Sequence, residues 1–219
     1  MRAMSRLEEI LSQAKEKLRE KEKAKRQIEE ASQKARVMAK QSILLVHRGE
    51  KETAEERLKE ASKFLEDVKG LLDRYPEFSA HGVVAAAWEE YSEAKIFTAL
   101  EKQGAFPEPL EVPLESYILG LGDVVGELRR TALDDLREGR LDRAEERLKR
   151  MEEIYDVLIS AEEMSILLKE LRRKIDIARG VIEATRGDLT LEAGRRRLAE
   201  SMRELMEKMG EKRDGEAER

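Results

Sequence analysis

Residues 117–130 read Y-I-L-G-L-G-D-V-V-G-E-L-R-R, and this stretch decides the fold class. Its apolar residues recur at the spacing of one helix face, at Tyr117, Leu121, Val124, Val125 and Leu128. Glycines at 120, 122 and 126 each lower helix propensity by roughly 1 kcal/mol relative to alanine, so we expect another element to approach closely here. Pro113 suits the first turn of this helix, where a missing N–H costs nothing.

The same periodicity extends over the rest of the chain and predicts an all-α fold of seven helices. The predicted helices cover about residues 7–49, 58–75, 80–99, 113–137, 141–160, 162–185 and 191–209. A proline-bearing connection at 105–113 separates the third from the fourth, and the R-G-D sequence at 186–188 separates the last two. We expect a single domain over residues 1–209 and a charged, disordered tail at 210–219.

Composition excludes several classes of function. Cysteine is absent, which leaves only oxygen or histidine ligands for a metal. No apolar run approaches the ~20 residues of a membrane span, and the first residues lack the apolar stretch of a secretory signal, so we expect a cytoplasmic protein. Charged residues make up 42% of the chain, but the net charge of -5 argues against a uniformly basic nucleic-acid binder. Any nucleic-acid surface must be local.

Four carboxylates form the candidate site. Glu90 and Glu93 lie in W-E-E-Y-S-E, and Asp123 and Glu127 lie in G-D-V-V-G-E-L. Spacings of three and four residues place each pair on one face of its own helix. A short connection favours antiparallel neighbours, so four acidic oxygens can converge in an apolar interior. Because buried like charges need a partner, the pattern suggests a hard divalent cation, Mg²⁺ or Mn²⁺.

Other interpretations of these acids compete with the metal site. Acids three or four residues apart are common on solvated helix faces. A di-iron bundle needs Glu-x-x-His pairs, and neither His47 nor His81 has a Glu three residues before it. An all-helical nucleoside triphosphate pyrophosphohydrolase uses paired E-x-x-E and E-x-x-D motifs, from which D-x-x-x-E departs in order and spacing. A salt-bridged core, neutralised by Arg129, Arg130 or Lys95 without a metal, also stays open.

Taken together, the motifs resemble the translin superfamily, and within it the branch of translin-associated factor X. The resemblance rests on four stretches of sequence. The first is K-Q-S-I-L-L-V-H-R, which contains Lys40, His47 and Arg48, and the second is E-Y-S-E-A, which contains Glu90 and Glu93. The third is Y-I-L-G-L-G-D-V-V-G-E-L-R-R, which contains Asp123, Gly126 and Glu127, and the fourth, A-R-G-V-I-E-A-T-R-G, is more loosely similar. It implies a seven-helix, translin-like subunit in a barrel-like octamer that encloses RNA. It also implies that the four acids bind a divalent ion for cleavage of single-stranded RNA.

The leading hypothesis is therefore a Mg²⁺- or Mn²⁺-dependent endoribonuclease. Glu90, Glu93 and Asp123 would hold the ion, and Glu127 would complete its shell or act as general base. We expect the contacts to RNA backbone at Lys40, His47 and Arg48, and a homo-oligomer as the assembly. A non-catalytic shell that binds single-stranded RNA or DNA and the pyrophosphohydrolase are the alternatives.

Overall fold

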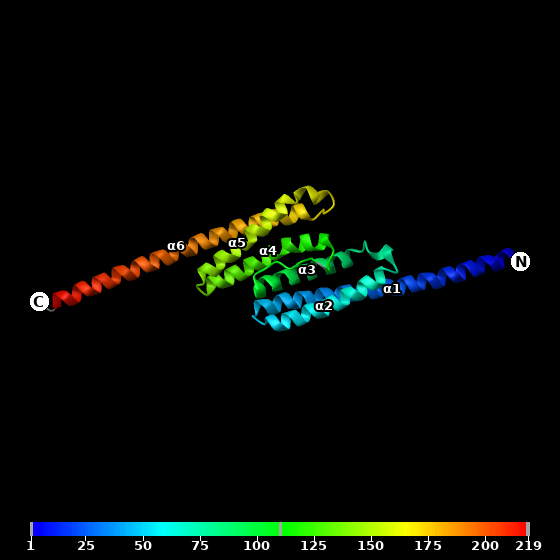
Figure 1. Ribbon diagram of the computed structural model, residues 1–219, viewed down its shortest axis with the longest axis horizontal. Helices are drawn as coiled ribbons and strands as arrows, with labels where there is room; N and C mark the ends of the chain where they lie inside the picture. Colours follow the sequence, from blue (N-terminus) through cyan, green and yellow to red (C-terminus); the bar gives the residue numbers. More distant parts are fainter. Residues whose placement is uncertain (1, 110, 218–219) are drawn as a thin grey trace. The chain divides into compact units, whose positions relative to one another are not determined.

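The computed structural model describes residues 2–109 and 111–217, with side chains over 6–109 and 111–209. Its helices are α1 (Arg2–His47), α2 (Lys51–Leu72), α3 (Gly82–Gln103), α4 (Leu114–Arg137), α5 (Leu141–Ser160) and α6 (Leu171–Ala217), with short 3₁₀ turns η1 (Pro76–Phe78) and η2 (Glu162–Ile166) (Figure 1). The described residues contain no strand, which confirms the all-α class. The chain divides into two compact units, Met1–Val124 and Val125–Arg219; the single domain over 1–209 stays a prediction.

The first unit is built around α1, α2 and α3, which lie side by side (Figure 1). The second half of α1 buries one stripe of small and branched residues: Ala24, Ile28, Ala35, Ala39, Ile43 and Val46. One core cluster joins the three helices. It contains Ile28 and Ala35 of α1, Leu65 and Val68 of α2, and Ala87 and Trp88 of α3. This packing fixes which face α3 turns toward α1, and with it the direction of the acids that α3 carries.

Two glycines end helices of this unit. Gly49 follows α1 with φ +81°, and Gly104 follows α3 with φ +70°. A left-handed residue just past a helix is most easily a glycine, because it has no Cβ to strain. The N–H of Gly104 donates to the Leu100 carbonyl at 3.0 Å. The chain thus leaves α3 sharply and enters the proline-bearing connection to α4.

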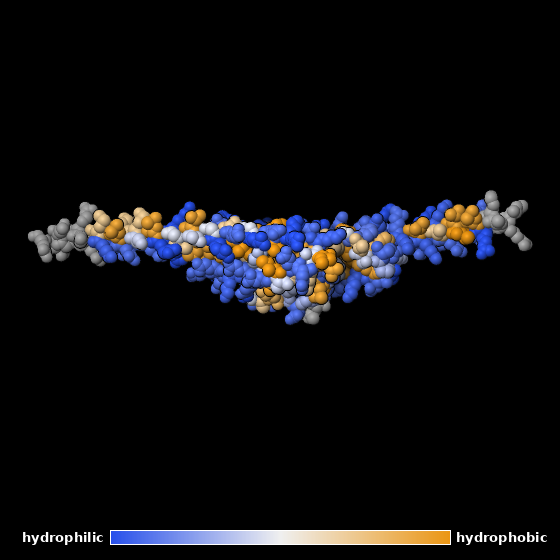
Figure 2. Space-filling view, turned by 90° about the horizontal axis from the view of Figure 1, so that it is seen from above, coloured by the Kyte–Doolittle hydropathy of each residue, from blue (hydrophilic) through white to orange (hydrophobic). Residues whose placement is uncertain are grey.

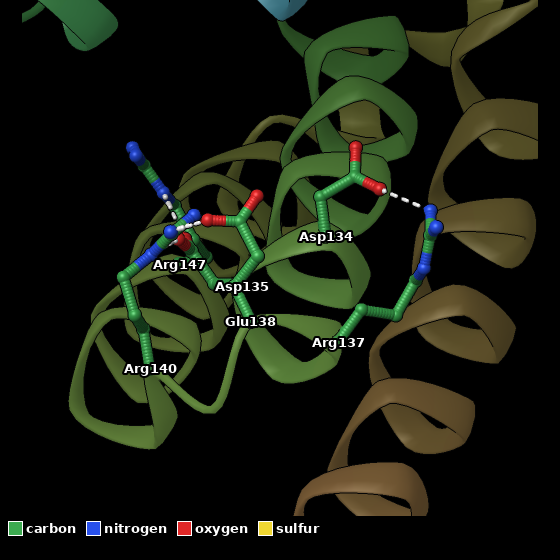
Figure 3. Close-up of polar contacts among 6 residues, drawn as sticks. All are labelled: Asp134, Asp135, Arg137, Glu138, Arg140 and Arg147. Carbon is green, nitrogen blue, oxygen red and sulfur yellow. Dashed lines mark hydrogen bonds and ion pairs between the residues drawn. The ribbon is translucent and has the colours of Figure 1, made fainter.

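The second unit contains α5, α6 and the end of α4. Ala132, Ala144 and Leu189 form its small core cluster, with Leu136, Leu141 and Leu148 packed against it. The turn from α4 to α5 is held by Asp135, which is 2% exposed and pairs with Arg140 at 2.7 Å and Arg147 at 3.5 Å (Figure 3). Arg140 also pairs with Glu138. Buried ionised groups of this kind persist only when they are paired.

The predicted count of seven helices is wrong for the described residues, which form six α-helices. Residues 162–166 form η2 instead of opening a helix, because the chain must reverse between α5 and α6. The R-G-D sequence does not break α6: Thr185 and Leu189 on either side are buried, and their packing outweighs the roughly 1 kcal/mol cost of Gly187. α6 continues to Ala217, and the side chains of the predicted tail, 210–219, lie outside the described residues.

Each terminal helix carries apolar side chains on its exposed part. Ten of these residues are more than half exposed. On α1 they are Leu7, Ile10, Leu11 and Leu18, and on α6 they are Leu191, Leu198, Met202, Leu205, Met206 and Met209. Figure 2 shows orange, apolar surface along both of these helix ends. No helix in the described part of the chain is long and apolar enough to cross a membrane.

Candidate functional site

The four predicted acids lie on two helices. Glu90 and Glu93 are one turn apart on α3, and Asp123 and Glu127 are one turn apart on α4. All four side chains are partly buried, and the residues beside them are buried ones: Tyr91, Ser92, Ala94, Val124, Val125 and Leu128. Glu90, Glu93 and Asp123 belong to the first unit, and Glu127 belongs to the second. These acids therefore do not lie on a solvated helix face.

Gly120 brings the start of α4 against α3. A Cβ added at Gly120 would lie 2.9 Å from the backbone nitrogen of Glu93, 2.9 Å from the Ser92 Cβ and 3.2 Å from the Glu89 carbonyl oxygen. Contacts under 3.0 Å are essentially never seen for a real Cβ, so only glycine allows this approach. The sequence predicted a close approach at the glycines of this helix; the structure confirms it at Gly120, whereas a Cβ at Gly126 would meet nothing within 4 Å. Asp123 lies one turn after Gly120, which puts it on the part of α4 that adjoins Glu93.

Glu90 is directed toward α1. Its Oε1 lies 3.0 Å from Lys40 Nζ and 3.3 Å from Arg36 Nη2. The Glu90 side chain is 20% exposed, against 59% for Lys40 and 36% for Arg36. Two cations of one helix therefore share a single, largely shielded carboxylate oxygen.

The salt-bridged interpretation is thus realised at Glu90, but with other partners than the sequence suggested. Lys95 pairs with Glu111 at 3.8 Å and lies 5.9 Å from the centre of the Tyr91 ring. Arg129 donates to Thr185 at 2.8 Å and to Asp188 at 3.1 Å within the second unit. Both cations have contacts of their own away from Glu90.

The donors fit a divalent ion in chemistry, although their side chains are not gathered into a ligand set. Carboxylate oxygens are the ligands that Mg²⁺ and Mn²⁺ prefer. Among the described side chains, however, no three His, Asp or Glu form a group that could hold a metal. In this structure the Oε1 of Glu90 is instead held by Arg36 and Lys40.

The three residues predicted to contact RNA all lie at the end of α1 or just after it. Lys40 forms an ion pair with Glu90. His47 is the last residue of α1, with its ring 5.0 Å from that of Phe97, and Arg48 follows in the turn with an exposed side chain. Lys40 is therefore next to a candidate metal ligand, and His47 lies two turns further along the helix.

Sequence reasoning missed Arg36. Its spacing of four residues before Lys40 was the available signal, because it puts both cations on one face of α1. In a chain with 42% charged residues that spacing occurs too often to single out one pair. Its Nε is buried and has no hydrogen-bond partner among the described residues, which distinguishes Arg36 from a solvated surface arginine.

Comparison with solved structures gives close matches over nearly the whole chain. The complex of AfC3PO with duplex RNA matches at 35% identity and a TM-score of 0.78, covering 85% of this chain and 97% of that one. The crystal structure of AfC3PO matches at 36% identity and a TM-score of 0.78, covering 85% and 98%. The crystal structure of apo-NeC3PO, at 24% identity and a TM-score of 0.76 over 83% and 96%, shares the fold. No protein-family model and no curated protein matches the chain.

Proposed function

The chain belongs to the translin superfamily, and from this membership we propose that it is a divalent-metal-dependent endoribonuclease acting on single-stranded RNA inside an oligomeric shell. The observation that carries the proposal is the set of partly buried acids on α3 and α4, next to the close contact at Gly120. The relative solved with duplex RNA supports RNA as the partner of this chain as well.

The position of each acid suggests its role in the proposed reaction. Glu90, Glu93 and Asp123 would hold the ion, and Glu127, one turn after Asp123, would complete the donor set or act as general base toward a water. Mg²⁺ or Mn²⁺ would supply Lewis-acid chemistry at the phosphate. The Glu90 side chain is 20% exposed, and electrostatic interactions at a shielded group are stronger than in bulk water.

Positive charge for the RNA backbone comes from the end of α1. Lys40, His47 and Arg48 lie on that helix or in the turn after it, and Lys40 is within 3.0 Å of a proposed metal ligand. Contacts to phosphate carry no base specificity, so we expect little sequence preference in cleavage. Single-stranded DNA is expected to bind the same surface without being the preferred substrate.

Self-association is part of the proposal. Contiguous exposed apolar side chains on monomers are uncommon and mark interaction sites. The exposed apolar residues of α1 and α6 support a homo-oligomer, and the family resemblance suggests an octamer. The proposed compartment is the cytoplasm.

The proposal is tested by the replacement Asp123→Asn in a cleavage assay on labelled single-stranded RNA with Mg²⁺ or Mn²⁺. We expect cleavage to fall by at least about 100-fold, because a lost charge-stabilising donor typically costs this much, while RNA binding and assembly persist. Asp134→Asn on the same helix is the control, since Asp134 pairs only with the exposed Arg137 at 3.2 Å among its described contacts, and it should cleave normally.

Two results would redirect the assignment. RNA binding without any product, under every divalent ion tried, would point to a non-catalytic RNA- or DNA-binding shell. Release of pyrophosphate from nucleoside triphosphates, lost in Asp123→Asn, would instead favour the pyrophosphohydrolase alternative. Running single-stranded and duplex RNA in parallel arms separates substrate preference from mere binding.

A further inference from the structure

The proposed metal ligand Glu90 also takes part in a double ion pair, to which the proposed chemistry assigns no role. Arg36 and Lys40 both reach the same oxygen, Oε1, at 3.3 and 3.0 Å. Two like charges this close to each other are tolerated because the carboxylate lies between them. In this arrangement one oxygen of the Glu90 side chain serves as the shared partner of both cations.

Arg36 uses little of its hydrogen-bonding capacity here. A guanidinium carries five N–H donors in a planar fork that matches a phosphate. Its Nη2 donates to Glu90, while its Nε is buried without a hydrogen-bond partner among the described residues. Lys40, one turn away on the same face of α1, is 59% exposed. An anion arriving at this face would therefore find two cations with donors to spare.

A divalent ion and these two cations compete for the same carboxylate. If Glu90 binds Mg²⁺, the ion's charge repels Arg36 and Lys40 from Oε1, and Glu90 can no longer neutralise them. The two side chains then need another anion within reach, and in an RNA-cleaving site the nearest one is a backbone phosphate.

We propose that Glu90 exchanges partners: Arg36 and Lys40 hold its carboxylate until a divalent ion takes it, and the released cations then bind an RNA phosphate. This inference rests on the proposed function and adds to it a new phosphate-binding residue, Arg36, and a coupling between metal and RNA. Each ligand strengthens binding of the other by the same factor, because coupling free energies are reciprocal.

The coupling is measured on the full-length protein with a fluorescent single-stranded 2′-O-methyl RNA that resists cleavage. In the wild type, we expect Mg²⁺ to tighten RNA binding about fivefold or more over EDTA. Glu90→Gln should bind RNA tightly already in EDTA and gain nothing from Mg²⁺, because glutamine cannot neutralise the two cations. Glu55→Gln removes the comparable Lys102–Glu55 pair, 2.8 Å long and 35% exposed on both sides, and should behave as wild type.

The double replacement Arg36→Gln with Lys40→Gln gives the complementary result. RNA binding should stay weak with and without Mg²⁺, and the slope of log affinity against log salt should be shallower by about 1.4, since each lost phosphate contact removes about 0.7 for single strands. Binding of Mn²⁺ alone, followed by calorimetry without RNA, should become tighter than in the wild type because the competing cations are gone. Circular dichroism of each variant verifies that the helix content of the chain is unchanged.

The outcomes separate this inference from the function on which it rests. If the wild type binds no Mn²⁺, the metal-dependent function itself fails. If the wild type binds Mn²⁺ but the double variant binds it with unchanged affinity, and Glu90→Gln shows no gain in RNA affinity, the partner exchange is wrong. In that case Arg36 and Lys40 serve only to hold α1 against α3.

Discussion

Gly120 of α4 packs directly against the backbone of Glu93 on α3: a Cβ placed on Gly120 would lie 2.9 Å from the Glu93 backbone nitrogen. Backbone cannot yield as a flexible side chain does, so the contact fixes how the start of α4 lies on α3. It thereby sets the position of Asp123, one turn further along α4, relative to Glu93. Gly120 is therefore needed both for the packing of α4 on α3 and for the position of Asp123 at the candidate site.

The first prediction concerns this contact. Gly120→Ala should lower the free energy of unfolding by about 1 to 3 kcal/mol, because overpacking forces the two helices apart, and it should weaken Mn²⁺ binding. Gly180→Ala on α6 is the matched control: a Cβ there meets nothing within 4 Å, and alanine should raise stability by about 0.5 to 1 kcal/mol. Urea denaturation and calorimetry measure both effects. Equal stability changes in the two variants would contradict the account.

The second prediction concerns the buried acid of the α4–α5 turn. Asp135→Ala should destabilise the protein by about 2 to 4 kcal/mol, because it leaves Arg140 and Arg147 without their shared, buried partner. Asp134→Ala, one residue away, removes a pair whose members are 44% and 82% exposed, and exposed pairs contribute at most about 1 kcal/mol (Figure 3). Thermal unfolding of the two variants provides the comparison, and similar losses would show that burial of Asp135 is not what matters.

The third prediction concerns alkaline pH. Burial raises the pKa of Tyr91 above its ordinary value of 10.0, and the nearby Glu111 and Glu66 add to the increase, while a hydrogen bond with Ser62 opposes it. The fold favours the neutral phenol, so its contribution to stability is complete below pH 10 and is lost as the pH rises through the raised pKa. Tyr91→Phe should therefore lose less stability than the wild type as the pH rises above about 10.

Denaturant midpoints across this range, together with the ultraviolet absorbance of phenolate, measure the effect. The phenylalanine removes only the hydroxyl and keeps the buried ring, so the comparison isolates the ionisation. Parallel loss of stability in both proteins would mean that other groups dominate the alkaline transition.

The fourth prediction concerns assembly. Leu11→Glu places a charge in the exposed apolar part of α1 and should weaken self-association about tenfold or more, because burying one leucine is worth about 1.5 to 3 kcal/mol. Ser12→Glu adds the same charge to a residue that faces another direction on the helix and should leave the molar mass unchanged. Light scattering after gel filtration distinguishes them. A monomeric wild type would contradict the proposed oligomer.

Periodicity predicted the all-α fold, because the apolar residues repeat at helical spacing along the chain. The close approach at Gly120 was also predictable, since glycines that cost helix stability need a packing reason. The sequence also predicted that α1 ends near Gly49 and that a proline-bearing connection precedes α4, because both depend on local chemistry. Local signals of this kind do not need knowledge of tertiary partners.

Features that depend on tertiary contacts were missed. The R-G-D sequence is a breaker by local rules, but Leu189 packs against Ala132 and Ala144, and the helix continues. The partners of Glu90 are 50 and 54 residues away in sequence, so spacing could not distinguish Arg36 from any other arginine. The sequence located the acids on their helices, and the direction in which Glu90 turns emerged only from the packing of α1 on α3.

The central claim is tested most directly by the anomalous scattering of crystals soaked in Mn²⁺. We predict one strong peak within about 2.5 Å of carboxylate oxygens of Glu90, Glu93 and Asp123, with Glu90 turned away from Arg36 and Lys40. A structure with no peak at these acids, and with Glu90 still paired to both cations at saturating Mn²⁺, would contradict the account.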